Sequence, residues 1–241
     1  MEPKRDRLSE WFVPQFGPLK FRIAVGLLFL PYTGMVLSYT TIGSMLSPVI
    51  YWDRVIAILA IYFFSLGIAA HALDAIGGAS EVKPWGTHFT QKALWAIAAI
   101  ALTFSYSIGI YYIVSAAPWL FIIALLEGFF LFAYNLEWFS GRFHTDFWFA
   151  FSWGVLPVAA GYILQTNAIT MHACIIAGAM GLISLVEINA SRPYKALKKS
   201  GELPSHQDRY EMILKSVSFS VMLIAIGMIL WRLTSPILPF N

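Results

Sequence analysis

Residues 54–73 read RVIAILAIYFFSLGIAAHAL, an apolar run in which only the first residue, Arg54, is charged. A helix that crosses a bilayer needs about 20 predominantly apolar residues. Within hydrocarbon, a helix satisfies its own backbone hydrogen bonds, whereas an open sheet edge leaves them unpaired. This run therefore predicts a transmembrane helix.

The same pattern recurs along the chain. The other apolar runs of suitable length are residues 23–46, 93–116, 118–136, 147–165, 169–189 and 213–233. The chain is 59% hydrophobic and 12% charged, against roughly 25% charged residues in a soluble domain. We therefore predict an all-α integral membrane protein with about seven transmembrane helices. The predicted segments are an interfacial segment (1–22), the helical bundle (23–233) and a C-terminal tail (234–241).

The N-terminal 22 residues contain five basic residues and no uninterrupted apolar core, so we expect no cleavable signal peptide. The stretch from Ser9 to Phe21 instead has the composition of an interfacial amphipathic segment. Its candidate lipid-facing residues are Trp11, Phe12, Phe16 and Leu19.

Basic residues are distributed unequally between the two faces of the predicted bundle. Fourteen of the 16 Lys and Arg residues fall on the N-terminal face, whereas Arg54 and Arg232 fall on the other. Cytoplasmic connections of membrane proteins carry the excess of Lys and Arg. The N-terminus and the long basic loops are therefore expected in the cytoplasm, and the C-terminus outside, which requires an odd number of spans.

Prolines and one long connection predict where the helices bend or end. Pro31 and Pro157 lie inside apolar runs, and proline kinks a helix. Residues 190–212 are polar and are expected to form a loop. Ser205, followed three residues later by Asp208, resembles a capping box that starts the last helix.

Two pairs of polar residues lie at the same end of predicted spans. His71 and Asp74 are three apart at the end of the second span, so they share one helical face. Glu187 and Asn189 occupy the corresponding depth at the end of the sixth span. Ionisable groups in membrane spans are costly and mark functional sites. Each acid alone could be a hydrated helix end, but their equal depth predicts one shared cavity.

The fourth span has polar residues of its own. Tyr134 and Asn135 lie near its end, whereas Glu127 lies near its middle. We expect Glu127 to be neutral or paired with a buried donor such as Tyr106 or Asn135, in a structural or a functional role.

Sequence signatures of soluble enzymes are absent. The chain contains no Walker loop, HExxH, paired CxxC or GxSxG, and nothing in it indicates nucleic-acid binding. One alternative is a membrane metalloprotein, because imidazole and carboxylate groups suit Zn or Fe. Its ligands would be His71, Asp74, His88 and Glu137 or His144.

Four stretches resemble the UbiA-type intramembrane prenyltransferase superfamily. HALDAIGG (71–78) stands at the position of its first acidic motif, and KPWGTHFTQKALWA (83–96) resembles the segment that follows. LVEINASRPYKALKK (185–199) takes the place of the second acidic motif. AYNLEWFSGRFHTDFWFAFSWGVLPVAAGY (133–162) is similar to the tyrosine–basic loop and the helix after it. The resemblance covers roughly residues 60–200.

The resemblance implies a helical bundle around a lateral cavity that is open to lipid. In the family, Mg²⁺ held by two acidic motifs binds a prenyl diphosphate, whose prenyl group passes to a lipid-soluble acceptor. By this resemblance, Asp74 and Glu187 are the catalytic and Mg²⁺-binding residues. His71, Asn189, Glu127 and Asn135 would be polar residues of the cavity. The implied diphosphate-binding residues are Lys83, Tyr134, Arg142 and Arg192.

The chain also departs from the family pattern. Gly78, Ser184 and Ser191 stand where further acids are expected, and seven spans replace the usual nine. A partner membrane subunit or a homo-oligomer would then complete the cavity wall. An alternative function is a non-catalytic UbiA-like subunit that binds a quinone, carotenoid or other isoprenoid in a larger complex. We find no inverted repeat that would indicate a transporter.

Overall fold

The computed structural model describes residues 7–77, 88–200 and 204–234. Every regular element in these segments is helical and none is a strand, so the predicted all-α class is confirmed. The π-helical segments and one 3-10 turn are labelled η. In chain order the elements are η1 (Arg7–Ser9), α1 (Leu19–Leu27), α2 (Leu30–Met45), α3 (Trp52–Tyr62), η2 (Phe63–Ala70), α4 (His71–Ile76), α5 (Gln91–Ser115), α6 (Leu120–Asn135), α7 (Asp146–Ala150), η3 (Phe151–Val155), α8 (Leu156–Thr166), α9 (Met171–Ser200) and α10 (Pro204–Thr234).

Five continuous helices are long and apolar enough to cross a membrane. They are formed by α3–η2–α4, α5, α7–η3–α8, α9 and α10. Together α1 and α2 would make a sixth span, bent by 42°. The remaining apolar helix, α6, has 16 residues. Several helices that could cross a membrane are thus present, whereas a total of seven stays a prediction.

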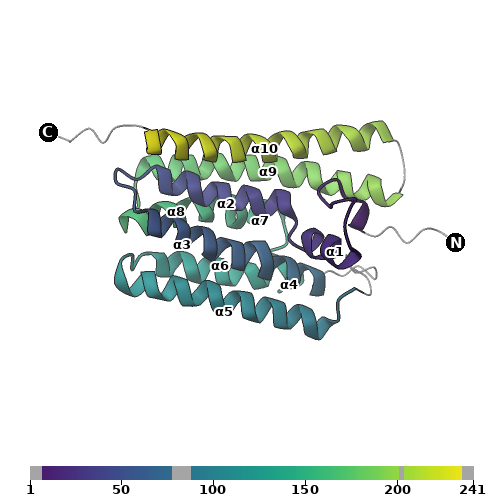
Figure 1. The fold of residues 1–241 in the computed structure, drawn as a ribbon, viewed down its shortest axis with the longest axis horizontal. Helices are drawn as coiled ribbons and strands as arrows, with labels where there is room; N and C mark the ends of the chain where they lie inside the picture. Colours follow the sequence, from purple (N-terminus) through teal and green to yellow (C-terminus); the bar gives the residue numbers. More distant parts are fainter. Residues whose placement is uncertain (1–6, 78–87, 201–203, 235–241) are drawn as a thin grey trace.

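The helices lie side by side along the long axis of the molecule (Figure 1). Helices α9 and α10 form one edge, α5 and α6 form the opposite edge, and α2, α3 and α8 lie between them. The first described turn, η1, and the C-terminal end of α10 lie at opposite ends of the bundle (Figure 1). This arrangement is consistent with an odd number of crossings.

The centre of the bundle depends on a close approach of α2 and α8. A Cβ atom added at Gly43 would overlap the carbonyl oxygen of Val158, and one added at Gly161 would overlap that of Thr40. Small residues let membrane helices approach until backbone packs against backbone. Ser44 adds a hydrogen bond across this contact by donating to the Gly161 carbonyl at 3.3 Å.

Each expected kink coincides with a change in helix geometry. Phe29 adopts a left-handed conformation (φ 44°, ψ 60°) between α1 and α2, and Pro31 lies in the first turn of α2. Pro157 lies in the first turn of α8, directly after the π-helical segment η3. At Pro31 the missing N–H has no intrahelical role, because the N–H groups of a first turn have no partner within the helix. Pro157 instead lies inside the continuous helix Asp146–Thr166, next to its π-helical segment.

The prediction of a loop over residues 190–212 is wrong. Helix α9 continues to Ser200 with Pro193 inside it, and α10 begins at Pro204, one residue before the predicted start. The polar composition misled the prediction, because a helix that leaves the membrane can stay helical in water. Ser205 and Asp208, which were expected to start the last helix, therefore both lie within α10.

The N-terminal segment packs on the bundle instead of presenting all its aromatic residues to lipid. Phe16 is 74% exposed, but Phe12 packs on Phe29 with their ring centroids 4.5 Å apart. Buried Glu10 accepts hydrogen bonds from Tyr194 (3.0 Å) and Lys198 (2.9 Å) of α9. This segment is therefore tied to α9, and Phe12 is partly buried against the bundle.

The two basic residues on the other face have structural partners. Arg54 donates to the carbonyl oxygens of Leu164 (3.1 Å) and Gln165 (3.0 Å), near the end of α8. Arg232 donates to the carbonyl of Met45, the last residue of α2, from Nη2 at 2.7 Å. The last carbonyls of a helix lack intrahelical donors, and basic side chains stabilise them. These residues therefore cap helices.

We expect Arg232→Ala to destabilise the bundle by about 1–3 kcal/mol, because it leaves C-terminal carbonyls of α2 without a donor. The melting temperature of the purified protein measures this loss. Arg209→Ala, at an exposed position of the same helix, is the matched control. Equal melting temperatures for the two variants would contradict the capping role.

Candidate functional site

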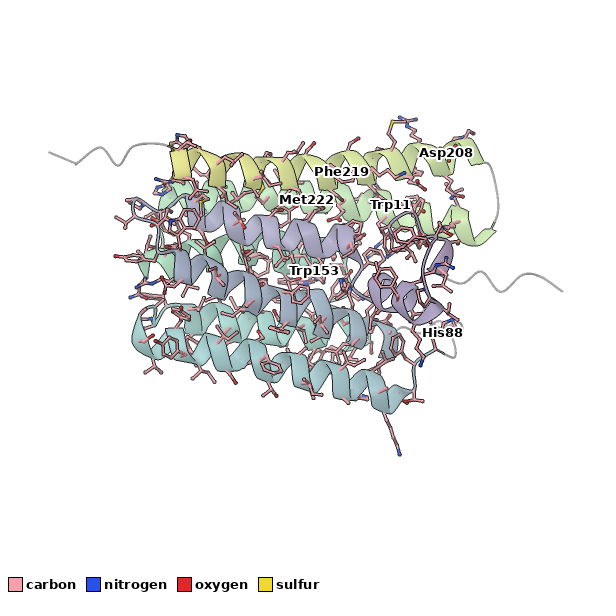
Figure 2. The ribbon with its side chains drawn as sticks, in the orientation of Figure 1. Trp11, His88, Trp153, Asp208, Phe219 and Met222 are labelled. Atoms are coloured by element: carbon pink, nitrogen blue, oxygen red, sulfur yellow. The ribbon has the colours of Figure 1, made fainter. Side chains whose placement is uncertain are left out.

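A polar cavity of about 380 Å³ lies among α2, α4, α6, η3 and α9. Its titratable and charged lining residues are His71, Asp74, Tyr134, His144, Arg192 and Lys195, together with Tyr32. Figure 2 shows Trp153, another lining residue, between the helices, whereas Trp11 and Asp208 lie toward the end where the N-terminal segment packs. We call this space the polar cavity.

Helix α4 contributes His71 and Asp74 to the polar cavity. The π-helical segment η2 ends at Ala70, directly before His71. A π turn inserts an extra residue into the helical register and often occurs at functional sites. The His71 ring lies between aromatic neighbours, 5.6 Å from Phe29 and 5.5 Å from Trp153 between ring centroids.

Helix α9 contributes two cations through the extension beyond the predicted span. The Nε of Arg192 lies 2.8 Å from Oδ1 of Asp146, the first residue of α7. The Nζ of Lys195 lies 5.4 Å from the ring centroid of Phe29 and 5.8 Å from that of Tyr32. Lys195 was not among the predicted site residues. Its position three residues after Arg192 would have indicated it had the helix been expected to continue.

The end of α6 and the following turn form another wall. The rings of Tyr134 and His144 stack with centroids 4.4 Å apart, and His144 Nδ1 lies 3.0 Å from the Tyr134 carbonyl oxygen. The Tyr134 hydroxyl is close enough to Arg192 and Asp74 to interact with both charges. Asn135 is buried and donates to the carbonyl of Leu131 at 2.7 Å.

Aromatic rings cover the deeper side of the polar cavity. Phe149 and Trp153 stack nearly parallel, with ring centroids 5.5 Å apart. Tyr32 makes T-shaped contacts with both rings, at centroid distances of 5.8 Å and 6.1 Å. The cavity thus combines a charged end with aromatic walls, and its lining includes Arg192 and Lys195 but one carboxylate, Asp74. Such a lining can bind an anionic group beside an apolar one.

Glu187 lies in a separate, smaller cavity of about 20 Å³. Its side chain is buried, and its Oε1 has no hydrogen-bond partner among the described residues. Phe29, Tyr32 and Lys195 border both cavities. Asp74 and Glu187 therefore face two neighbouring spaces that share a wall, instead of the one shared cavity that their depth predicted.

The remaining predicted residues lie elsewhere. Lys83 falls outside the described residues. Arg142 is exposed in the connection between α6 and α7, and Asn189 is exposed on α9, where it donates to the Leu185 carbonyl at 2.8 Å. Neither lines the polar cavity.

Glu127 lines a third pocket and has a donor that the sequence did not indicate. The hydroxyl of Tyr62 donates to its Oε1 at 2.8 Å. The two donors expected from the sequence bond elsewhere, Tyr106 to the Ala124 carbonyl and Asn135 to that of Leu131. Glu127 is therefore paired with a buried donor, as expected, but the donor is Tyr62 of α3 and not Tyr106 or Asn135.

Among the described residues, no group of three or more His, Cys, Asp and Glu side chains is arranged to hold a metal ion. Asp74 and Glu187 do not form a joint two-acid centre, because Glu187 does not line the polar cavity. Asp74 alone fits a single Mg²⁺ that is shared with phosphate oxygens, since Mg²⁺ is often bound by one carboxylate and its substrate.

No family model, curated protein or solved structure matches this chain. The resemblance to UbiA-type enzymes therefore depends on the motifs in the sequence and remains a prediction.

Proposed function

We propose that the polar cavity binds the diphosphate of a prenyl diphosphate and that the protein transfers the prenyl group to a lipid-soluble acceptor, as a UbiA-like enzyme. The observation that carries this proposal is the pair Arg192 and Lys195 beside Asp74, in a 380 Å³ cavity with aromatic walls. A diphosphate needs cationic partners, and a prenyl chain needs apolar or aromatic ones.

In this proposal the residues of the chain have distinct roles. Arg192 and Lys195 bind the diphosphate and stabilise its charge as the allylic C–O bond breaks. Tyr32, Phe149 and Trp153 line the cavity, and their π electrons would stabilise an allylic cation. The acceptor then forms a bond to the allylic carbon and loses a proton. Mg²⁺, if held by Asp74 and the phosphate oxygens, would add positive charge at the leaving group.

Sidedness and assembly belong to the same proposal. The basic residues Arg192, Lys195 and Lys198 lie at the end of the bundle where the N-terminal segment packs, which we place in the cytoplasm by the positive-inside rule. Seven crossings follow if the bent α1–α2 pair and α6 both span the membrane. A homo-oligomer or a partner subunit would complete the lateral wall.

The second candidate function is a non-catalytic subunit that binds an isoprenoid. The placement of Asp74 and Glu187 in separate cavities favours it, because a joint Mg²⁺ centre would require both acids in one space. The cations and aromatic walls would then retain a lipid without cleaving it.

Turnover of a prenyl diphosphate tests the proposal. The full chain in lipid nanodiscs would be incubated with radiolabelled geranylgeranyl diphosphate, Mg²⁺ and a total lipid extract as the source of acceptor. We expect diphosphate release that Asp74→Asn reduces at least about 100-fold, because only that carboxylate lines the polar cavity. Glu187→Gln should have a smaller effect, and Asp208→Asn, at an exposed position, should have none.

Two results would decide against transfer. Full release by Asp74→Asn would exclude the proposed site. Saturable binding of the labelled diphosphate without release, in the native protein, would instead support the non-catalytic subunit.

A further inference from the structure

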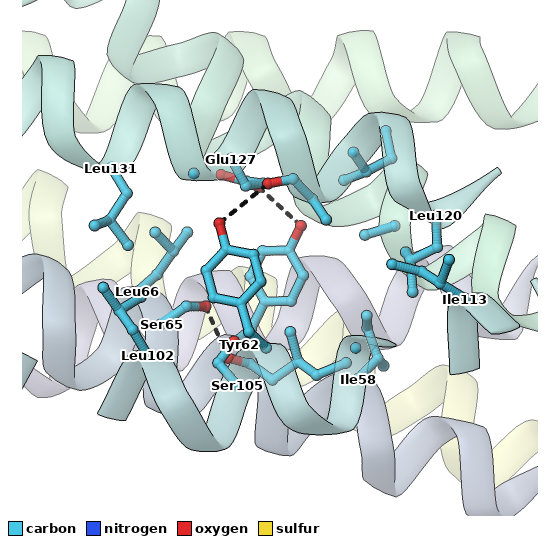
Figure 3. A pocket seen from close by; sticks show the side chains of 17 residues that line it. Ile58, Tyr62, Ser65, Leu66, Leu102, Ser105, Ile113, Leu120, Glu127 and Leu131 are labelled. Carbon is cyan, nitrogen blue, oxygen red and sulfur yellow. Dashed lines mark hydrogen bonds between the residues drawn. The ribbon is translucent and has the colours of Figure 1, made fainter. Parts of the chain in front are cut away.

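A second ligand site is indicated by the pocket around Glu127, which is separate from the polar cavity. The pocket lies between α3–η2, α5 and α6 and encloses about 50 Å³ (Figure 3). Tyr62 and Glu127 point toward one another across it, from α3 and α6. None of its lining residues lines the polar cavity, so the two spaces are distinct.

Half of the Glu127 carboxyl group lacks a hydrogen bond within the described protein. Oε1 accepts from Tyr62 at 2.8 Å, whereas Oε2 is shielded from solvent and has no partner among the described residues. Buried polar atoms are nearly always hydrogen-bonded to protein, water or a ligand. In a membrane span, a carboxyl group with an open hydrogen-bonding position is a functional feature.

Two glycines line the pocket, one beside open space and one beneath a tyrosine. A Cβ atom added at Gly109 would meet no atom within 4 Å, so the wall of α5 is open at this point. At Gly128, an added Cβ would overlap the hydroxyl of Tyr106, which donates to the Ala124 carbonyl at 3.3 Å. Tyr106 therefore rests directly on the backbone of α6.

Tyr106 lies between the pocket and the outer surface of the bundle. It lines the pocket and is also 37% exposed on the apolar outer surface of α5. Helix α5 lies at the edge of the bundle (Figure 1). An apolar chain in the bilayer could therefore reach Glu127 beside this side chain.

The lining narrows the chemistry of the ligand. Glu127 is the one acid among the lining residues, and no His, Cys, Lys or Arg joins it, so the lining does not form a metal or anion site. A volume of about 50 Å³ is too small for a phosphate or sugar head group with its hydration. A hydroxyl group fits, and it can donate to a carboxylate or accept from a carboxylic acid.

We propose that this pocket binds a membrane-dissolved long-chain alcohol, with its hydroxyl hydrogen-bonded to Oε2 of Glu127 and its chain leaving between α5 and α6 beside Tyr106. A carbonyl ligand would suit only the protonated acid, because it cannot donate. The alcohol completes the hydrogen bonding of Glu127 in either state.

Photolabelling of the full chain in phosphatidylcholine nanodiscs tests this proposal. The probe is hexadecanol with a diazirine near its hydroxyl end, and the comparison probe is the corresponding diazirine-bearing hexadecane. Peptide mass spectrometry locates the labels. We expect the alcohol to label the pocket residues of α5 and α6 about tenfold more than the hydrocarbon does.

Variants distinguish labelling that depends on the hydrogen bond to Glu127 from labelling by a probe that only dissolves in the apolar pocket. Glu127→Leu should reduce labelling by the alcohol to the hydrocarbon level, whereas Glu127→Gln should retain most of it, because an amide also donates and accepts. Gly109→Leu should block the pocket without a clash at its Cβ. Gly178→Leu, at an exposed glycine of α9 with nothing within 4 Å, is the matched control and should label normally.

Two outcomes would overturn the proposal. Equal labelling of the pocket by both probes would show a site that water alone completes. Undiminished labelling of folded Glu127→Leu would show that the hydroxyl binds elsewhere. If Gly109→Leu does not fold, the comparison of Glu127→Leu with Glu127→Gln still tests whether the alcohol binds at Glu127.

Discussion

Gly161→Leu should prevent the bundle from assembling, whereas Gly178→Leu should leave it folded. Gly161 lies where α8 presses against α2, and a Cβ there would overlap the Thr40 carbonyl oxygen. Backbone atoms cannot turn aside as a flexible side chain can, so the helices would have to separate. Gly178 has nothing within 4 Å of the same added atom.

The expected cost at Gly161 is about 3 kcal/mol or more, at the upper end for overpacked interiors. Separating α2 from α8 would also break the Ser44 hydrogen bond to Gly161 at 3.3 Å. Such a loss is a large fraction of the stability of an ordinary domain.

Monodisperse elution in detergent and the melting temperature measure this effect. Gly161→Ala should show a smaller loss of the same sign, since even a methyl group meets the Thr40 carbonyl. A Gly161→Leu protein that melts like the Gly178→Leu control would mean that the α2–α8 contact is looser than described.

Lys195→Gln should weaken binding of a prenyl diphosphate about 10- to 100-fold, the range for a lost hydrogen bond to a charged group. Lys195 lines the polar cavity and lies over the rings of Phe29 and Tyr32. Arg192 should be less sensitive to substitution alone, because its Nε is already paired with Asp146 at 2.8 Å. The double substitution should abolish measurable binding.

Equilibrium binding of radiolabelled geranylgeranyl diphosphate in nanodiscs measures this loss, and it does not require turnover. Lys215→Gln is the matched control, because Lys215 is partly exposed and pairs with Glu211 four residues earlier at 2.6 Å. If Lys195→Gln bound the diphosphate with the affinity of the native protein, the polar cavity would not be the diphosphate site. The measurement applies to the catalytic and the non-catalytic function alike.

Helix positions were largely predictable from the sequence, because the length of an apolar run is a local property set by bilayer thickness. The run at residues 54–73 lies within the helix Trp52–Ile76. The prediction of helix ends failed where the composition becomes polar but the backbone stays helical. Residues 190–200 are polar, yet α9 continues through Pro193.

The candidate site was only partly predictable. His71, Asp74, Tyr134 and Asn135 were selected by their depth in the spans, and Arg192 by the family resemblance; all five line the polar cavity. Depth alone does not determine the direction in which a side chain points. Glu187 therefore lies in a neighbouring cavity although its depth had matched that of Asp74.

By itself the sequence determined the all-helical class and the positions of helices apolar enough to cross a membrane, since apolar length is read without knowing any contact. Only the tertiary structure decided which polar groups meet. In the folded chain Lys195 and Asp74 line one cavity, and Tyr62 donates a hydrogen bond to Glu127. These pairings depend on packing between distant segments, which local periodicity does not encode.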